Sequence, residues 1–327
     1  MEIRDFKSYK IAGMAVMYNI NYTFNITKIF PLITIAWRRL NNPRHADIIS
    51  LKYGTFQRGC GSVSSGCMKN MIMARISIKG QIVSIKFNSD KIHVCGTKDY
   101  EVPRMVCKAF LTHLDILYDT ILLIKTDRER YNKFINDYTG DDLKGFIKYI
   151  EDHRGSYDDD ILNFIENQIY DYIHGSYGRS DITSCRQQLL HMIDQVDDID
   201  EVPDDFEIIK ENTNMLNYNY DIGEILDRPI RLIKFNTIEK LMGIKNCVIN
   251  ADNRVKQSIT IQIRSKDGHM HRIIINRNGK IIHSSHNMES MENIYNKLMS
   301  ILLDDYCIED KDLYKVDRYD LKELLGL

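Results

Sequence analysis

The feature of this sequence that most constrains its fold is an internal repeat. Residues 86–99 read KFNSDKIHVCGTKD, and residues 276–287 read NRNGKIIHSSHN. Both stretches follow an apolar, β-rich run, place a short polar turn before a Lys-Ile pair and lead into a helix-like segment. At an offset of 189 residues an Arg and a Lys recur with one spacing, as Arg75 and Lys91 and again as Arg264 and Lys280. A pattern that returns after so long an interval indicates a repeated structural unit.

Each copy predicts the same order of elements: a strand that runs into a helix, several antiparallel strands, and a long helix. The strands are predicted from alternating β-branched residues between turn signals such as Asp267-Gly268. The long helices are predicted from apolar residues three or four positions apart within residues 101–119 and 288–306. The predicted fold class is therefore α+β with a duplicated antiparallel sheet.

The charge is distributed unevenly along the chain. Residues 125–210 contain 10 Lys and Arg against 21 Asp and Glu, a net charge of −11, whereas the whole chain carries −2 and the remainder therefore +9. A basic remainder can bind a polyanion. The acidic stretch is compatible with a solvated helical decoration, a surface for a basic partner, or a DNA mimic. We expect a first repeat over residues 1–124, a mainly helical acidic connector over 125–210, a second repeat over 211–306 and a tail over 307–327.

Composition and motifs disfavour several classes of protein. The seven Cys are odd in number and scattered, which favours reduced thiols over a disulfide framework. No apolar run approaches the roughly 18 residues of a membrane span, and the first ten residues lack the apolar core of a secretory signal. The sequence has no glycine-rich phosphate loop, nucleophile elbow or HExxH motif, so we expect neither an enzyme nor a cofactor.

Two clusters contain residue types that ligate metals. Cys60 and Cys67 flank a Gly/Ser-rich loop, but six residues separate them and no second pair has zinc-ligand spacing, so free thiols are expected. The other cluster consists of five histidines in predicted strands: His93, His269, His271, His283 and His286. Alternation between core and surface accounts for them without a metal. We predict no metal site.

The element order and the turn motifs resemble those of the TATA-box-binding protein family. KFNSDKIHVCGTK is similar to that family's Phe-x-x-Gly-Lys, Thr-Gly and Lys run with substitutions. The layout around ISLKYGTFQRG and NYNYDIG is similar to divergent versions from large cytoplasmic DNA viruses. The resemblance covers roughly residues 11–120 and 211–306. It implies a duplicated antiparallel saddle with helices on the convex face, a concave face on the DNA minor groove, and the acidic connector as an insertion between the copies.

Carried over position by position, the resemblance implies a set of DNA-contacting residues. Basic side chains would hold phosphates, and apolar or small polar side chains would face the groove floor. Alternation places Ile85 and Phe87 on one strand face, which we expect to face the groove, with Phe87 as a wedge between base steps. Asn276 at the corresponding place cannot wedge, and the remaining wedge positions fall near Met68–Lys69 and Ser258. The expected DNA-contacting residues are Arg75, Ile85, Phe87, Lys91, Cys95, Asn214, Arg264, Ile274, Asn276, Lys280 and Ser284.

The function implied by the resemblance is that of a transcription initiation factor on an AT-rich viral promoter. Its partners would be double-stranded DNA, the viral RNA polymerase and a factor-IIB-like protein at Lys266–Met270, with no membrane. Its location would be the viral factory in the host cytoplasm, with packaging in the virion left open. The alternative is a protein-interaction scaffold that retains the saddle and has lost DNA binding, which the missing wedges favour and the basic residues disfavour. An accessory domain of a nuclease or glycosylase is a third reading, disfavoured because no catalytic constellation is present.

Overall fold

The computed structural model describes residues 5–60, 70–174, 181–199, 205–226, 230–233, 247–250, 258–276, 278–302 and 308–310. These residues form an α+β fold with a large antiparallel sheet, as the sequence predicts. They divide into a first unit, Val16–Asn212, and a second unit, Met1–Ala15 with Thr213–Leu327. Strands β1 (Ile11–Ile20) and β7 (Ile208–Asp221) each contribute one part to either unit. None of the described helices combines the length and apolarity that a membrane crossing requires.

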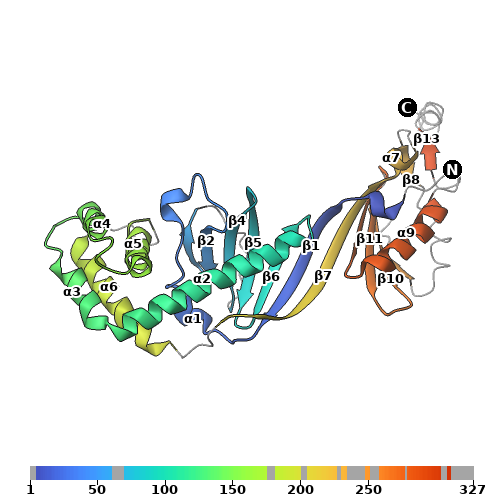
Figure 1. Ribbon diagram of the computed structural model, residues 1–327. Helices are drawn as coiled ribbons and strands as arrows, with labels where there is room; N and C mark the ends of the chain where they lie inside the picture. Colours follow the sequence, from blue (N-terminus) through green and yellow to red (C-terminus); the bar gives the residue numbers. More distant parts are fainter. Residues whose placement is uncertain are drawn as a thin grey trace, which may run out of the picture. The chain divides into compact units, whose positions relative to one another are not determined.

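The strands of the first unit are ordered β3-β2-β4-β5-β6-β1. The β4–β5 turn is the two-residue Lys79-Gly80, and both residues have positive φ, 47° and 73°. Two-residue hairpin turns favour this conformation because its twist matches that of the strands. Helix α2 (Glu101–Thr126) lies along the sheet (Figure 1) and packs against β4 and β6. The strand bounds are β2 (Ile48–Tyr53), β3 (Phe56–Gly59), β4 (Ile72–Ile78), β5 (Gln81–Asn88) and β6 (Lys91–Thr97).

The core of the first unit lies between one sheet face and α2. Ile72 of β4 lies opposite Phe87 of β5 in the hydrogen-bond register, and both side chains are 0% exposed. The Phe87 ring centroid is 5.2 Å from that of Phe24 and 5.1 Å from that of Phe110 in α2. Burying one such side chain stabilises a fold by about 1.5–3 kcal/mol. This apolar layer therefore determines which strand residues point inward.

Between residues 128 and 198 the described residues form mainly helices, which belong to the first unit. Figure 1 shows them gathered at one end of α2. Asp142 caps the N-terminus of α4, where its Oδ1 accepts a hydrogen bond from the backbone N of Gly145 at 2.7 Å, as expected for an acidic helix start. Asp158 lies just before α5 and its Oδ1 accepts a hydrogen bond from the backbone N of Asp160 at 2.9 Å. The helices are α3 (Arg128–Asp137), α4 (Leu143–Asp152), α5 (Asp159–His174) and α6 (Ile182–Gln195).

A buried ion pair joins α5 to strand β3. The side chains of Arg58 and Asp171 are 10% and 12% exposed and form this ion pair. The indole Nε1 of Trp37 donates a hydrogen bond to the Asp171 carboxylate at 2.9 Å. Residues 16–124 of the first repeat and the connector thus share one compact unit, so residue 124 is not a boundary between compact units.

The strands of the second unit are ordered β7-β12-β11-β10-β9. Their bounds are β9 (Cys247–Asn250), β10 (Ser258–Arg264), β11 (Met270–Asn276) and β12 (Lys280–Ser285). The long helix α9 (Met288–Leu302) follows β12, and the short helix α7 (Ile222–Leu226) follows β7. Strands β8 (Ile230–Ile233) and β13 (Ile308–Asp310) form a separate antiparallel pair. The expected tail over 307–327 otherwise lies outside the described residues.

The core of the second unit combines an aromatic cluster with two buried histidines. Tyr220 lies with its ring centroid 4.8 Å from that of Tyr295 in α9. Its hydroxyl is 3.2 Å from Nδ1 of His283, whose Nε2 is 3.0 Å from Nδ1 of His271. Burial, together with a smaller contribution from repulsion by neighbouring histidines, lowers the pKa of His271 to about 4 and that of His283 to about 3. Both rings are therefore neutral in the folded protein at pH 7.

Lowering the pH from 7.5 to 5 should destabilise the second unit through His271 and His283. In this window each ring stays neutral when folded and takes a proton when unfolded, where its pKa is about 6.5. The stabilisation is full above that value and is lost as the pH falls toward the folded pKa values, by at most about 2 kcal/mol for each histidine at pH 5. Urea midpoints at the two pH values measure the loss. The double variant His271→Asn/His283→Asn should flatten the dependence, and His269→Asn/His286→Asn should not; equal slopes in both variants would contradict the assignment.

Asp171→Ala should lower the free energy of unfolding of the first unit by about 3 kcal/mol, because Arg58 would remain buried without its partner. Urea unfolding followed by circular dichroism measures the effect. The matched control is Asp194→Ala, which removes one surface partner of Arg128. Exposed ion pairs are screened by solvent, so this variant should keep the wild-type midpoint. Equal losses in the two variants would show that the buried pair does not anchor α5.

Candidate nucleic-acid interface

The sheet face of the second unit that points away from the core is built in rows across four strands. One row contains Thr260, Ile274, Ile282 and Asn219, and the next contains Gln262, Arg272, Ser284 and Asn217. The residues that alternate with them in β10–β12 point into the core: Ile261, Ile263, Ile273, Ile275, Ile281 and His283 are at most 1% exposed. We call the outward residues the second open face: Asn217, Asn219, Asp221, Ser258, Thr260, Gln262, Arg264, Met270, Arg272, Ile274, Asn276, Lys280, Ile282 and Ser284.

The first unit has a corresponding open face. One row contains Ser50, Arg75, Ser84 and Cys95, and the next contains Lys52, Met73, Lys86 and His93. Asn88 and Lys91 face each other at the end of the β5–β6 hairpin. We call these ten residues the first open face; within it Ser50 and Met73 are buried, at 0% and 7% exposure. Arg75 is half-buried, and its Nη1 donates to the carbonyl oxygen of Cys60 at 3.4 Å.

Both open faces are basic. The first contains Lys52, Arg75, Lys86 and Lys91 and no Asp or Glu, although Asp90 of the adjoining turn lies 3.8 Å from Lys91. The second contains Arg264, Arg272 and Lys280, and the register places Asp221 opposite Lys280. Several cations on one surface with few anions between them create a positive potential that attracts polyanions.

The charge of Lys86 is felt by the neighbouring side chains of the first open face. Burial lowers the pKa of His93, and Lys86 and Lys91 lower it further by repelling the imidazolium. Burial raises the pKa of the Cys95 thiol, while Lys86 acts in the opposite direction by stabilising the thiolate. His93 therefore adds little positive charge to this face at neutral pH, and the lysines and Arg75 supply it.

Eight of the expected DNA-contacting residues lie on the two open faces. They are Arg75, Lys91, Cys95, Arg264, Ile274, Asn276, Lys280 and Ser284. Ile85 and Phe87, the other two residues of the first copy expected on this surface, do not lie on it. Ile85 and Phe87 are 0% exposed and belong to the core under α2, so the expected groove-facing orientation of both is wrong. The expected wedge is a core residue because Phe87 packs between Phe24 and Phe110.

Turn length explains why a fixed offset misassigned these residues. The β5–β6 turn contains two residues, Ser89-Asp90, whereas three residues, 277–279, separate β11 from β12. Cys95 and Ser284 therefore correspond at an offset of 189, but their partners Ser84 and Arg272 correspond at 188. A shift of one residue moves a side chain to the other sheet face. Ile274 and Asn276 are outward for this reason, while Ile85 and Phe87 are inward.

Asn214 and the residues around it show a related difference. Asn214 is exposed, but it is two residues from the buried Leu216 on β7. Side chains two apart on a strand point to the same side, so Asn214 is not on the side of β7 that contributes to the second open face. Sequence reasoning missed Asn217 and Asn219, which the period-two pattern of Leu216, Tyr218 and Tyr220 would have identified. The Oδ1 atom of Asn217 is buried and has no hydrogen-bond partner among the described residues.

The remaining expected positions are of three kinds. Met68–Lys69 and Cys67 lie outside the described residues, and Cys60 is an exposed free thiol. Ser258 lies in β10 opposite Asn276. Four of the five histidines form pairs: the rings of His269 and His286 approach to 2.6 Å, and those of His271 and His283 to 3.0 Å. Among the described residues no group of three His, Cys, Asp or Glu is arranged to hold a metal ion.

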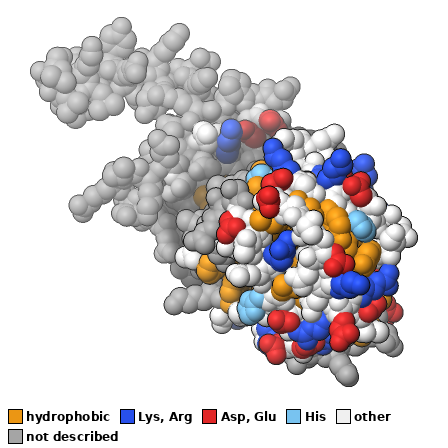
Figure 2. Space-filling view, turned by 90° about the vertical axis from the view of Figure 1, so that its left-hand side faces the viewer, with side chains coloured by type: hydrophobic (Ala, Val, Ile, Leu, Met, Phe, Trp, Pro, Cys, Tyr) orange, Lys and Arg blue, Asp and Glu red, His pale blue; other side chains and the backbone are white. Residues whose placement is uncertain are grey.

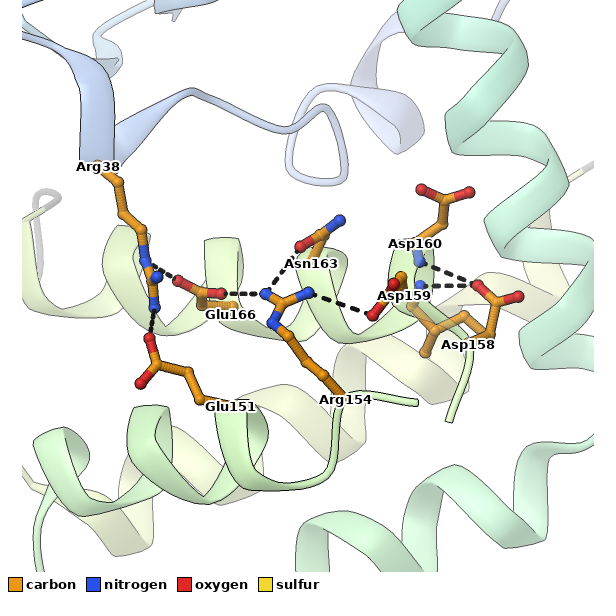
Figure 3. Close-up of polar contacts among 9 residues, drawn as sticks. Arg38, Glu151, Arg154, Asp158, Asp159, Asp160, Asn163 and Glu166 are labelled. Atoms are coloured by element: carbon orange, nitrogen blue, oxygen red, sulfur yellow. Dashed lines mark hydrogen bonds and ion pairs between the residues drawn. The ribbon is translucent and has the colours of Figure 1, made fainter. Parts of the chain in front are cut away.

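A cavity of about 440 Å³ in the first unit is the other polar site of note. Glu166 bridges two arginines at its edge: Oε1 lies 2.5 Å from Nε of Arg38, and Oε2 accepts from Nη2 of Arg154 at 2.9 Å (Figure 3). Arg38 also pairs with Glu151 of α4 at 2.7 Å, and Arg154 donates to Asn163 of α5 at 3.0 Å. These cations and anions compensate one another, so the site links α4 and α5 to the segment before β2.

The end of the first unit that contains α3–α6 has mixed charge. Figure 2 shows this side with Lys and Arg side chains interspersed among Asp and Glu side chains, and hydrophobic side chains between them. A DNA mimic requires a surface of one negative sign, so the mixture disfavours that interpretation for this face. No family model matches the sequence, and no curated protein matches it either.

Phe87→Ala should lower the free energy of unfolding of the first unit by about 3–5 kcal/mol, as expected for a large-to-small change in a core. Lys86→Ala is the matched control, because Lys86 is the adjacent residue on the first open face and its truncation creates no cavity. Urea unfolding followed by circular dichroism measures both. If Phe87→Ala unfolds at the wild-type midpoint, Phe87 is not a core residue.

Proposed function

We propose that this protein is a DNA-binding transcription initiation factor of the TATA-box-binding-protein type, and that its open faces contact an AT-rich promoter in the minor groove. The observation that carries the proposal is the set of basic residues on these faces: Arg75, Lys86, Lys91, Arg264, Arg272 and Lys280. Duplex DNA presents a dense array of phosphates, and each phosphate that a Lys or Arg neutralises releases counterions.

A duplicated saddle is the structural part of the proposal. The strand orders β2-β4-β5-β6-β1 and β9-β10-β11-β12-β7 follow the same connectivity. In each, the strand that comes first in the sequence (β1 or β7) lies beside the strand that comes last (β6 or β12). A long helix follows the last strand in each case, α2 after β6 and α9 after β12. This parallel supports two copies of one unit, with α3–α6 as an insertion after the first.

The second open face has a composition that suits the floor of a minor groove. Ile274 and Ile282 lie opposite each other, and the row continues to Thr260 on one side and Asn219 on the other. Ile282 is 37% exposed, so its apolar side chain is accessible to a partner. In the minor groove A·T pairs present only acceptors, which amide and hydroxyl donors can meet. A preference for AT-rich DNA follows.

The proposed bend in the DNA is shallow. Kinking of the TATA-box-binding-protein type requires apolar side chains that insert between base steps. Phe87 is buried, and none of the residues that define the first open face is Phe, Tyr or Trp. By the same resemblance, the turn at Lys266–Met270 would receive a factor-IIB-like protein, and the complex would recruit the viral RNA polymerase in the viral factory of the host cytoplasm.

A protein-interaction scaffold without DNA binding is the second candidate function. The observation that favours it is the burial of Ile85 and Phe87, which removes the expected wedging surface from the first unit. In this alternative the open faces bind proteins instead of phosphates. Affinity for duplex DNA at low salt separates the two functions.

Lys91→Glu combined with Lys280→Glu should weaken binding to an AT-rich duplex by roughly tenfold or more, because both changes repel phosphates. Fluorescence anisotropy at several salt concentrations measures affinity, and the slope of log affinity against log salt should fall by about two. The matched control is Lys133→Glu with Lys144→Glu on α3 and α4, which alters net charge equally at two exposed positions.

The control separates a local contact from a general charge effect. If both double variants lose affinity equally, net charge rather than the open faces governs binding. If wild-type protein binds no duplex at low salt, the DNA-binding proposal is wrong and the scaffold function becomes the better account.

A further inference from the structure

A hollow of about 220 Å³ lies at the edge of the second open face, and its chemistry points to one kind of ligand. Its lining includes side chains that can donate hydrogen bonds and no Asp or Glu: Asn214, Gln262, Arg272, Ser284 and His286. Two exposed methionines, Met215 and Met270, also line it, at 40% and 43% exposure, together with the buried His271 and Ser285. Donors without a carboxylate favour an anion, and flexible thioethers favour an apolar group beside it.

Arg272 is the central cation of this hollow. It projects from the middle of β11, opposite Gln262 of β10 and Ser284 of β12. It is exposed and forms no ion pair with any described residue, unlike Arg38, Arg58 and Arg154 of the first unit. A guanidinium presents donors in a fork that matches phosphate oxygens, so an uncompensated Arg among neutral donors is a good phosphate ligand.

The histidine pair lies at one edge of the hollow. His286 approaches His269 through Nε2 at 2.6 Å, which leaves its Nδ1 outside that contact. Ser285 donates from its hydroxyl to the carbonyl oxygen of Met270 at 3.0 Å, so its side chain links β12 to the β11 backbone at this edge. The hollow is therefore built on paired strands rather than on a loop alone, which keeps Arg272 and Ser284 in fixed relation.

We infer that this hollow seats one sugar–phosphate unit of a nucleic-acid strand, with the phosphate at Arg272 and its neutral donors and the sugar against Met215 and Met270. The inference rests on the proposed function and deepens it, because it assigns the phosphate to Arg272, a residue that the family resemblance does not mark. A mononucleotide offers the same chemistry as a strand. The two sources are separated below.

A scan with single methylphosphonates tests the seat. Each phosphate of an AT-rich duplex is replaced in turn by this neutral group, and affinity is measured for wild type, Arg272→Gln and Arg264→Gln. Wild type should lose roughly tenfold at one position, because one charge-assisted contact is removed. Arg272→Gln should be weaker on unmodified DNA and insensitive at that position. Arg264→Gln is the matched control, since Arg264 is on the same face outside the hollow, and it should retain the sensitivity.

Methyl NMR of methionine-labelled protein provides the second arm, with thymidine 5′-monophosphate as the probe. The Met215 and Met270 methyl signals, assigned by Met→Leu variants, should shift in wild type and not in Arg272→Gln. Shifts with the nucleotide but no duplex binding would retain the seat, make a mononucleotide its ligand and refute the proposed function. Duplex binding with identical methylphosphonate profiles in wild type and Arg272→Gln, and no methionine shifts, would refute the seat and leave the proposed function standing.

Discussion

Packing of the sheet of the first unit against α2 is the constraint on which the candidate interface of that unit depends. The rings of Phe24, Phe87 and Phe110 meet in this layer. Once these side chains are inside, the period of two along each strand leaves Arg75 and Lys86 on the other face. A residue that contributes to the core cannot also insert into DNA. Packing in the core, rather than the residue type of Phe87, therefore determines which side chains on this face are accessible to a partner.

Ion pairs give the acidic segment its place in the first unit. Asp171 is held by Arg58 and Trp37, and Glu166 bridges Arg38 and Arg154, so that part of the negative charge of residues 125–210 is compensated internally. Buried pairs contribute less to stability than apolar packing of similar volume, but removing one partner is costly. Their effect here is to fix α5 against β3 and the segment before β2. The segment is an integral part of the unit and not an appended domain.

The two open faces differ in chemistry, and the proposed function uses that difference. The first contains four cations and no exposed aromatic residue, which suits contact with phosphates. The second combines three cations with the Ile274–Ile282 pair and with amides and hydroxyls, which suits the groove floor. Phosphate contacts set affinity and its salt dependence, whereas contacts in the groove discriminate between base pairs. Under the proposal, sequence preference therefore resides mainly in the second unit.

The sequence by itself determined the α+β class, the long helix that begins at residue 101 and the separation of an acidic segment from a basic remainder. These follow from local periodicity and composition, which neighbouring residues define among themselves. Only the tertiary structure decided the faces. Corresponding residues are 189 apart in β6 and β12, 188 apart in β5 and β11, and 187 apart in β4 and β10, because the hairpin connections differ in length. A change of one residue in the offset moves a side chain to the other face of the sheet. Which face is buried depends on what packs against it. No fixed offset could therefore have placed Phe87 in the core and Arg272 outside it.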